Sequence, residues 1–357
     1  MKILALNSSK GWGGNERWLT TALNGLNQRG HRVCLIKRTG TSHWSNLNAS
    51  IETIDAPFTN EFSFKTKSVI KNIIKNKKID ILLSTKRKDY VLGAQIKNKV
   101  NIHHIMRLGI SRPILKRDFL QRYIISNMVD GIIVNAKSLK KELLNYRFIK
   151  SNLNHDSICC IYNGYDVPDL KTNQRDYRRQ GALIRAAGRL TAHKGYDILL
   201  SSLNSIKDIK FNYKLEIAGE GPDRNKLEKL IEKYNLQSQC ELVGEKNDII
   251  NFFSKADLVI IPSRSEGIPN TLFEAWMSKK PIITTNVGGI CEVVDNMKNG
   301  MICEPNSMHI KEALKKYIDN SNEFKNMGLN GYNKLIQMFT MEKMSTNLED
   351  YFKGFLI

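Results

Sequence analysis

Apolar runs of strand length alternate with amphipathic stretches of helix length along nearly the whole chain of 357 residues. This alternation is typical of parallel sheets covered by helices, because parallel neighbours need a long crossover connection. The strands expected in the first half are Lys2–Asn7, Arg32–Lys37, Ile81–Ser84, Asn101–Met106 and Gly131–Val134, with helices notably at Glu16–Arg29 and Lys65–Asn76. A fresh series of expected strands follows at Leu183–Ala187, Lys214–Ala218, Cys240–Val243, Leu258–Ile261 and Pro281–Thr284.

A polar segment separates the two series of strands. Residues 163–181, NGYDVPDLKTNQRDYRRQG, replace the hydrophobic pattern with polar and turn-forming side chains. A chain of this length also exceeds one ordinary hydrophobic core. We therefore expect an α/β fold of two doubly wound, Rossmann-like domains, residues 1–166 and 167–339, with the boundary near Asp166. Because open parallel sheets bind ligands at the carboxyl ends of their strands, we expect a binding cleft where two such edges face each other.

The composition is that of a folded soluble protein, with 41% hydrophobic and 25% charged residues. The apolar start, MKILALNSS, stops at Asn7 and is too short for a signal-peptide core or a membrane span. The six cysteines are scattered, without the CxxC spacing of a zinc site or the density of a disulfide scaffold. These features predict reduced cysteines and a cytoplasmic protein.

Positive charge is concentrated in the first half of the chain. The formal net charge is +20, and the stretch from Asn60 to Ile125 holds sixteen basic and only four acidic residues. Nucleic acid, an anionic membrane surface and a phosphorylated substrate would all suit such a region. A solvated lysine-rich surface without a partner is the alternative.

A candidate binding site lies in SEGIPNTLFEAW, residues 265–276, directly after the buried strand DLVIIPS. Asn270 is expected to cap a helix that begins at Thr271, and the free N–H groups and dipole of that helix start favour an anion such as a diphosphate. Glu266 precedes this helix start and Glu274 lies one turn inside it. Carboxylates accept hydrogen bonds from paired hydroxyls, which suits a sugar and a ribose. Alternatively, Glu274 only favours the helix start and Glu266 is a surface residue.

Basic and glycine residues follow other expected strands. Arg189 and Lys194 come after a strand that ends at Gly188, where they could bracket phosphate oxygens or be ordinary surface charges. Glycines follow the strands at Gly219 and Gly221, at Gly288 and Gly289, and at Gly13 and Gly14 in GWGGNERW, where they would allow close approach of a ligand. The last of these does not match the GxGxxG pattern of dinucleotide-binding proteins.

The spacing Glu266-x7-Glu274, together with AGRLTAHKG, IAGEGPDRNKLEKLI, KPIITTNVGGICEVV, GGNER and IYNGYD, resembles the retaining nucleotide-sugar glycosyltransferases of family four, which have the two-domain GT-B fold. The resemblance implies that Glu266 binds the donor sugar, Glu274 the ribose, and the two bases the diphosphate. It further implies a nucleotide-sugar co-substrate with no cofactor and no metal. The implied donor-binding positions are Gly13, Gly14, Arg189, Lys194, Gly219, Ile268, Asn270, Thr271, Leu272 and Glu274.

One departure concerns a histidine that many family members carry after a strand of the first domain. Here the strand reads VNIHHIMRLGI, with His103 and His104 inside it and Arg107 at the position aligned with the family's histidine. We expect Arg107 to contact the donor, with His104 as the alternative. Arg107 and His104 join Glu266 as the candidate catalytic residues.

The acceptor is expected to bind the first domain, where the resemblance is weakest. SVIKNIIKNKKIDILL and RPILKRDFLQRYII mix apolar residues at helical spacing with bases, as in a peripheral membrane face or in helices that face the core. The favoured function is transfer to a glycan or glycolipid acceptor, lipid-linked, in bacterial surface polysaccharide or lipopolysaccharide synthesis on the inner face of the plasma membrane.

Two alternatives remain from the sequence. The first is a soluble synthase or sugar epimerase of the same fold. The second is a nucleic-acid-binding protein, which is disfavoured because Tyr90 is the only aromatic residue between Lys65 and Lys99 that could stack on bases. The last segment, FTMEKMSTNLEDYFKGFLI, resembles the family's final helix, which packs back on the first domain. Deleting residues 340–357 is therefore expected to destabilise both domains.

Overall fold

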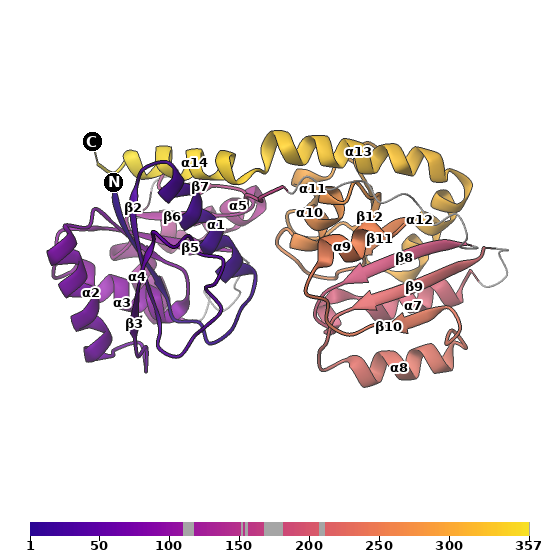
Figure 1. The fold of residues 1–357 in the computed structure, drawn as a ribbon, viewed down its shortest axis with the longest axis horizontal. Helices are drawn as coiled ribbons and strands as arrows, with labels where there is room; N and C mark the ends of the chain where they lie inside the picture. Colours follow the sequence, from indigo (N-terminus) through magenta and orange to yellow (C-terminus); the bar gives the residue numbers. More distant parts are fainter. Residues whose placement is uncertain (110–117, 151–152, 154–155, 168–180, 207–210, 357) are drawn as a thin grey trace. The chain divides into compact units, whose positions relative to one another are not determined.

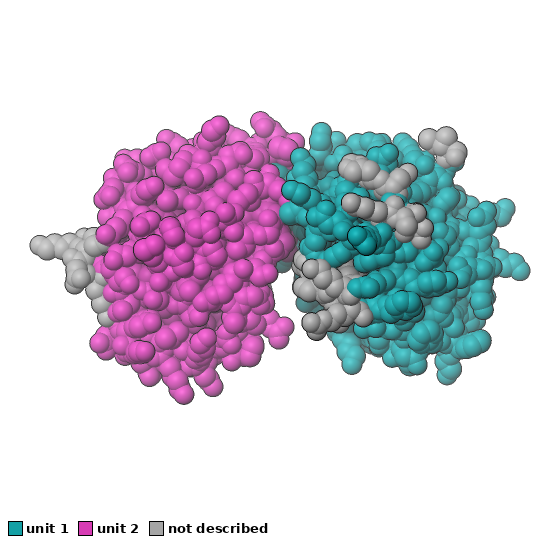
Figure 2. Space-filling model, turned by 180° about the vertical axis from the view of Figure 1, so that it is seen from behind, with its two compact units in different colours: residues 1–166, 339–357 teal, residues 167–338 magenta. Residues whose placement is uncertain are grey.

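The computed structural model describes residues 1–109, 118–150, 153, 156–167, 181–206 and 211–356, and it contains two parallel sheets covered by helices (Figure 1). Contacts divide the chain into unit 1, residues 1–166 with 339–357, and unit 2, residues 167–338 (Figure 2). The two sheets confirm the expected α/β class of two doubly wound sheets. Most of the predicted linker, residues 168–180, lies outside the described residues.

Unit 1 is built on a seven-stranded parallel sheet in the order β3-β2-β1-β4-β5-β6-β7. Its strands are β1 (Lys2–Asn7), β2 (Arg32–Arg38), β3 (Glu52–Ala56), β4 (Ile81–Ser84), β5 (His103–Leu108), β6 (Gly131–Val134) and β7 (Ile158–Cys160). Its first helices are α1 (Gly14–Gln28), α2 (Phe64–Lys77), α3 (Arg87–Lys97), α4 (Phe119–Asn127), α5 (Lys137–Leu144) and α6 (Arg147–Lys150).

The strands of unit 1 are apolar on both faces, and each face has its own core. Along β1, Ile3 and Ala5 pack into a core with α1, whereas Leu4 and Leu6 pack into a core with α2 on the other face. Successive side chains of a strand point to opposite faces. A strand buried on both faces therefore needs a continuous apolar run, which is the pattern that predicted this sheet.

Unit 2 repeats the architecture with six parallel strands in the order β10-β9-β8-β11-β12-β13. Its strands are β8 (Ala182–Ala187), β9 (Tyr213–Ala218), β10 (Cys240–Leu242), β11 (Leu258–Ile261), β12 (Ile282–Thr285) and β13 (Met301–Cys303). Its helices are the short turn η2 (Ala192–Lys194), α7 (Tyr196–Asn204), α8 (Arg224–Lys233), α9 (Ile249–Ser254), α10 (Asn270–Met277), α11 (Ile290–Val293), α12 (Ser307–Asp319) and α13 (Ser321–Met338).

In each sheet the strand order reverses once, between β1 and β4 in unit 1 and between β8 and β11 in unit 2. At such a switch point the loops that leave the two neighbouring strands diverge, which opens a crevice for ligands at the carboxyl edge. The loops in question are those after Asn7 and Ser84 in unit 1, and those after Ala187 and Ile261 in unit 2. Most of the residues predicted for a site lie in these loops or in the helices that directly follow them.

The chain returns to unit 1 through α14 (Met341–Lys353), as expected for the C-terminal helix. Leu348 and Phe352 are buried in the core that α1 covers. Glu349 accepts a hydrogen bond at 2.5 Å from Arg29, the residue that follows α1. The Lys353 ammonium and this contact with Arg29 hold the pKa of Glu349 at about 2. Among the described residues, no helix is long and apolar enough to cross a membrane.

The structure corrects several sequence predictions. Three strands were not predicted: β3 carries exposed polar residues at the sheet edge, and β7 and β13 are only three residues long. The strand predicted at Asn101–Met106 is β5, which runs to Leu108, so Arg107 lies inside it. Asn270 is not the cap of α10 but its first residue, and Pro269 occupies the cap position.

Candidate active site

The carboxyl edge of unit 2 holds an ion pair between two predicted site residues. Lys194, at the end of η2, donates a hydrogen bond to Glu266 Oε1, and Ser263 Oγ donates to the same oxygen at 3.1 Å. These residues come from the loops after β8 and β11, which are neighbouring strands at the switch point. The structure therefore brings Lys194 and Glu266 together in a partly buried cluster.

A second contact fixes the same two loops to each other. Arg264, two residues before Glu266 in the sequence, forms a forked ion pair with Asp197 of α7, with distances of 2.5 and 3.0 Å. Its backbone N–H also donates to the carbonyl of His193 at 2.7 Å. Tyr196, at the first position of α7, is buried below the cluster, where burial and the nearby Glu266 charge raise the pKa of its hydroxyl. The loops that carry Lys194 and Glu266 are thus joined by several contacts besides the pair itself.

The glycines of this edge serve backbone packing. Gly219 has a φ of +140°, and a Cβ there would lie 2.1 Å from the carbonyl oxygen of Gly188. Gly288, in the loop after β12, has a φ of +57°, and its Cβ would lie 1.8 Å from the carbonyl oxygen of Glu266. Gly289 N–H also donates to the Gly267 carbonyl at 2.8 Å. Close approach of loop to loop accounts for these glycines, whereas the sequence suggested close approach to a ligand.

Helix α10 starts beside this cluster and carries the second glutamate. Glu274 is buried one turn inside the helix, and Asn270 and Thr271 at its start are partly exposed. Leu272 N–H already donates to the Pro269 carbonyl at 3.2 Å, and the side chain of Ile268 is buried. Ile268 therefore offers a ligand chiefly its backbone.

Of the two predicted donor-binding bases, Arg189 is more exposed than Lys194. It follows Gly188 directly after β8, and its side chain is exposed. Within the part of the chain that the structure describes, its guanidinium forms no ion pair. Arg189 and Lys194 therefore place two positive charges near the same edge, one exposed and one paired with Glu266.

The carboxyl edge of unit 1 carries a buried polar network. Glu16 of α1 is only 2% exposed, and it accepts hydrogen bonds from Lys86 Nζ at 2.8 Å and from Asn7 Nδ2 at 3.2 Å. Burial acts to raise the pKa of Glu16, but the Lys86 ammonium and the hydrogen bonds to Glu16 together outweigh burial and hold the pKa below its usual value. Asn7 also donates to Thr85 Oγ1 at 3.1 Å, which joins the ends of β1 and β4. None of these four residues was among the predicted site residues, although Asn7 ends the predicted strand Lys2–Asn7 and Thr85 directly follows the predicted strand Ile81–Ser84.

Arg107 joins that network from β5. Its guanidinium donates to Asn15 Oδ1 at 2.6 Å and to Asn163 Oδ1 at 3.4 Å, and it lies 4.6 Å from the centre of the Trp18 ring. The motifs GGNER and IYNGYD supply Asn15 and Asn163, so the structure brings together three segments that the sequence singled out. Gly13 and Gly14 lie at the start of α1 beside them, with Gly13 in the cap position.

His104, the alternative to Arg107, is fully enclosed. Its two ring nitrogens lie 2.9 Å from Ser84 Oγ and 3.0 Å from the Met128 carbonyl. Burial lowers the pKa of His104 to about 4, so the ring is neutral at physiological pH. With both nitrogens engaged inside the sheet, His104 has the environment of a structural residue. Arg107 is also buried, but its guanidinium is engaged by side chains of segments that lie outside the sheet.

Comparison with known proteins assigns the chain to a family. The family described as Glycosyl transferases group 1 matches residues 172–334, and the one described as Glycosyltransferase Family 4 matches residues 12–168. A protein of Methanocaldococcus jannaschii described as an uncharacterized glycosyltransferase is 35% identical over 281 residues, covering 76% of this chain and 75% of that protein. The chain belongs to the family 4 glycosyltransferases.

Two further relatives carry more informative names. The capsular polysaccharide biosynthesis glycosyltransferase CapM of Staphylococcus aureus is 25% identical over 234 residues, covering 63% of this chain and 62% of CapM. The structure of Anabaena HepE in complex with UDP-glucose has a TM-score of 0.81 at 18% identity, covering 99% of this chain and all of HepE. The second likeness shows the GT-B fold, and the family is a retaining one that uses nucleotide sugars.

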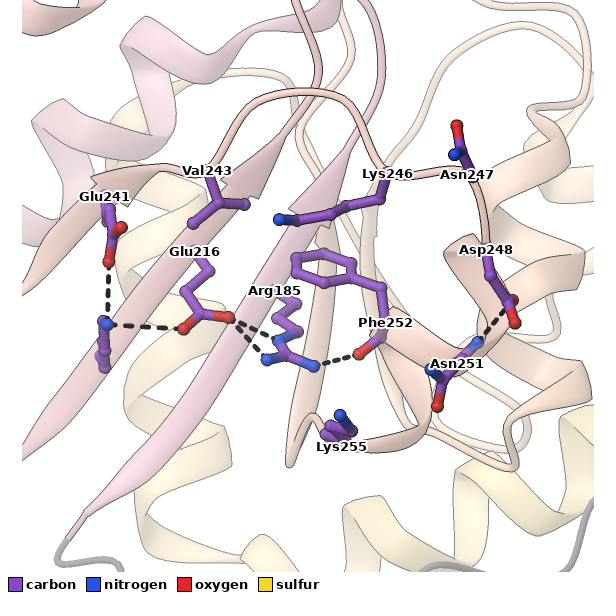
Figure 3. A pocket seen from close by; sticks show the side chains of 11 residues that line it. Arg185, Glu216, Glu241, Val243, Lys246, Asn247, Asp248, Asn251, Phe252 and Lys255 are labelled. Carbon is purple, nitrogen blue, oxygen red and sulfur yellow. Dashed lines mark hydrogen bonds and ion pairs between the residues drawn. The ribbon is translucent and has the colours of Figure 1, made fainter.

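A pocket in unit 2 of this glycosyltransferase is lined by none of the residues predicted for the donor site. It has a volume of about 540 Å³ and is lined by the middle of β8, β9 and β10 and by the segment from Lys246 to Lys255 (Figure 3). Arg185 forms an ion pair with Glu216 at 2.6 Å, and Lys214 forms one with Glu241 at 2.9 Å. These paired charges form a ladder across the strands, and we assign the pocket no part in donor binding.

Proposed function

We propose that this glycosyltransferase moves a sugar from a nucleoside-diphosphate sugar to a lipid-linked glycan acceptor in bacterial surface polysaccharide or lipopolysaccharide synthesis. The observation that carries the donor site is the Lys194–Glu266 pair at the switch point of unit 2, beside the start of α10. The name of the relative CapM, which refers to capsular polysaccharide biosynthesis, supports the class of pathway.

In the proposed donor complex, Glu266 accepts hydrogen bonds from the sugar hydroxyls and Glu274 accepts them from the ribose. The diphosphate occupies the start of α10, where Arg189 and Lys194 supply positive charge. Lys194 is already held by Glu266, so its ammonium can be shared between that carboxylate and a phosphate oxygen. Departure of a nucleoside diphosphate leaves negative charge, and fixed positive groups stabilise that charge in the transition state.

Arg107 is the residue of unit 1 that we propose to contact the substrates, in preference to His104. Its guanidinium is held in place by Asn15 and Asn163, and the Trp18 ring covers it. A cation positioned in this way pays little conformational entropy when it binds an anion. The acceptor is proposed to reach the enzyme at an anionic membrane surface, which the excess of basic residues between Asn60 and Ile125 supports.

The donor proposal is tested by thermal unfolding of the protein with UDP, GDP, ADP or CMP and the matching nucleotide sugars. A ligand at a hundred times its Kd stabilises the folded state by about 2.7 kcal/mol, or roughly 5–10 °C for a unit of this size. We expect one diphosphate to give such a shift, and UDP is the first to test because HepE was crystallised with UDP-glucose.

The matched variants are Glu274→Gln and Glu232→Gln. Glu232 is an exposed glutamate of α8 in the same unit. The shift should disappear in the first variant and persist in the second. A wild-type protein that no nucleotide stabilises, or a Glu274→Gln protein that is stabilised as much as the wild type, would refute the proposed donor site.

A further inference from the structure

Four exposed aromatic side chains gather on unit 1. The structure exposes five large aromatic side chains among the residues it describes, and four of them lie at or near the starts of α2 and α4: Phe62 (57% exposed), Phe64 (85%), Phe119 (81%) and Tyr123 (50%). Single exposed apolar residues are normal, but a group of large ones indicates an interaction surface. We call Phe62, Phe64, Phe119 and Tyr123 the aromatic surface.

One arginine holds the two segments of the aromatic surface together. Arg87, the first residue of α3, forms ion pairs with Glu61 at 3.0 Å and with Asp118 at 3.1 Å. Glu61 precedes Phe62 and Asp118 precedes Phe119 in the sequence. Because a single guanidinium reaches both carboxylates, the segments 61–64 and 118–123 are neighbours. The aromatic surface is therefore one feature of the fold, although its two segments are more than fifty residues apart in the sequence.

Two acids of this region are paired with Arg87, and two of its lysines have no acidic partner among the described residues. Glu61 and Asp118 are both engaged by Arg87. Lys67 and Lys88 form their hydrogen bonds with neutral acceptors, namely the Gln95 amide oxygen and the backbone carbonyls of Phe58 and Thr59. Lys67 Nζ also lies 4.7 Å from the centre of the Phe64 ring. Aromatic side chains and two lysines that form no ion pair with any described residue thus lie on the same surface.

The pairing of exposed aromatic rings with lysines is the arrangement by which proteins bind the interface of an anionic bilayer. The rings enter the boundary between headgroups and acyl chains, and the basic groups remain among the phosphates. Phe119 and Tyr123 are four residues apart in α4 and project from the same face of that helix. We propose that the aromatic surface inserts into an anionic phospholipid membrane, an inference that rests on the membrane-borne acceptor proposed above and assigns the residues that reach the membrane.

The test uses the full-length protein and sedimentation with lipid vesicles, without nucleotide or acceptor. The wild type should sediment with vesicles that contain phosphatidylglycerol and phosphatidylcholine, should remain in solution with pure phosphatidylcholine, and should be released by salt. The double variant Phe64→Ser with Phe119→Ser should lower the partition coefficient by about tenfold or more, because it removes two apolar side chains from the interface.

The matched control is the double variant Met308→Ser with Leu329→Ser, which removes two exposed apolar side chains of unit 2 (59% and 48% exposed). It should bind vesicles as the wild type does. All four positions are exposed, so both variants should unfold at the wild-type temperature. Both should also keep the stabilisation by the nucleotide, which separates a failure at the membrane from a failure at the donor site.

Three results would overturn the proposal. The first is a wild type that does not bind anionic vesicles, and the second is an aromatic-surface variant that binds them as well as the wild type. The third is a different partner at the aromatic surface. This would be a dimer, detected by sedimentation velocity, or bound RNA, and in either case the Phe64→Ser, Phe119→Ser variant would lose the interaction.

Discussion

The substitution Gly288→Ala tests whether the backbone position of Glu266 controls recognition of the donor sugar. A Cβ at position 288 would lie 1.8 Å from the Glu266 carbonyl oxygen, and Cβ contacts under 3.0 Å essentially do not occur. The two loops must therefore separate by about 1.2 Å, the difference between those distances. The neighbouring hydrogen bond from Gly289 N–H to the Gly267 carbonyl, 2.8 Å long, resists any simple rotation away from the contact.

A displacement of this size is enough to break a hydrogen bond. An optimal bond of about 2.8 Å lengthened by about 1.2 Å exceeds the range of a hydrogen bond. Each hydrogen bond between a sugar hydroxyl and a carboxylate contributes roughly 1.5–3 kcal/mol, so the loss of one raises the Kd by about tenfold to a hundredfold. The loss should weaken the binding of the nucleotide sugar and leave the binding of the nucleoside diphosphate unchanged, because only the sugar is proposed to contact Glu266.

Calorimetric titration of both ligands measures this difference. Gly30→Ala is the matched control: Gly30 has a φ of +83° in unit 1, and a Cβ there would have no atom within 4 Å. Both alanines bear the cost of a left-handed conformation, about 1–2 kcal/mol of stability, but only Gly288→Ala displaces a loop of the site. If Gly288→Ala weakens the binding of both ligands equally, or weakens neither, the assignment of Glu266 to the sugar is contradicted.

Three further predictions concern the diphosphate, the C-terminal helix and the response to acid. Lys194→Met should weaken the binding of a nucleoside diphosphate by about tenfold or more in titration calorimetry and leave the binding of the unphosphorylated nucleoside unchanged. Equal effects on the binding of both ligands would refute a phosphate contact. Phe352→Ala in α14 should cost about 3–5 kcal/mol in urea unfolding of unit 1, because the ring is fully buried in that unit's core; a cost below about 1 kcal/mol would contradict this packing. His104, whose pKa falls from 6.5 to about 4, should contribute stability that is complete above about pH 6.5 and lost as the pH falls towards 4, by up to about 3 kcal/mol. The wild-type curve of stability against pH should therefore be steeper over that range than the curve of His104→Gln, and parallel curves would refute the shift.

The structure indicates which of the two units the C-terminal segment stabilises directly. The sequence predicts that deletion of residues 340–357 destabilises both domains, whereas Leu348, Glu349 and Phe352 of α14 all make their contacts within unit 1. We therefore expect the deletion to lower directly the stability of unit 1 against unfolding. The long helix that precedes it, α13, belongs to unit 2, where it packs on α10.

The sequence predicted those strands whose physical cause is local. Strands such as β1 and β11 are buried on both faces and therefore appear as continuous apolar runs. The edge strand β3 was missed because Glu52, Thr53 and Asp55 give it no such run. Arg107 was placed after its strand because a charged residue ordinarily marks the end of an apolar run. Its partners Asn15 and Asn163 become neighbours only in the folded unit, so the sequence could not show that β5 continues through it.

The same distinction explains what could be known of the candidate site. Lys194 and Glu266 were each predicted at the carboxyl end of a strand, because an apolar run followed by polar residues shows where a strand ends. Their contact depends on β8 and β11 being neighbours, and strand order is a property of the whole sheet. Gly219 and Gly288 were recognised as special positions, but the atoms that exclude a side chain there belong to adjacent loops. Strand order therefore brings residues with separate local signals together into one site. For this reason Gly288 can test the proposed sugar contact although it lies more than twenty residues from Glu266. The substitution alters no residue assigned to the donor.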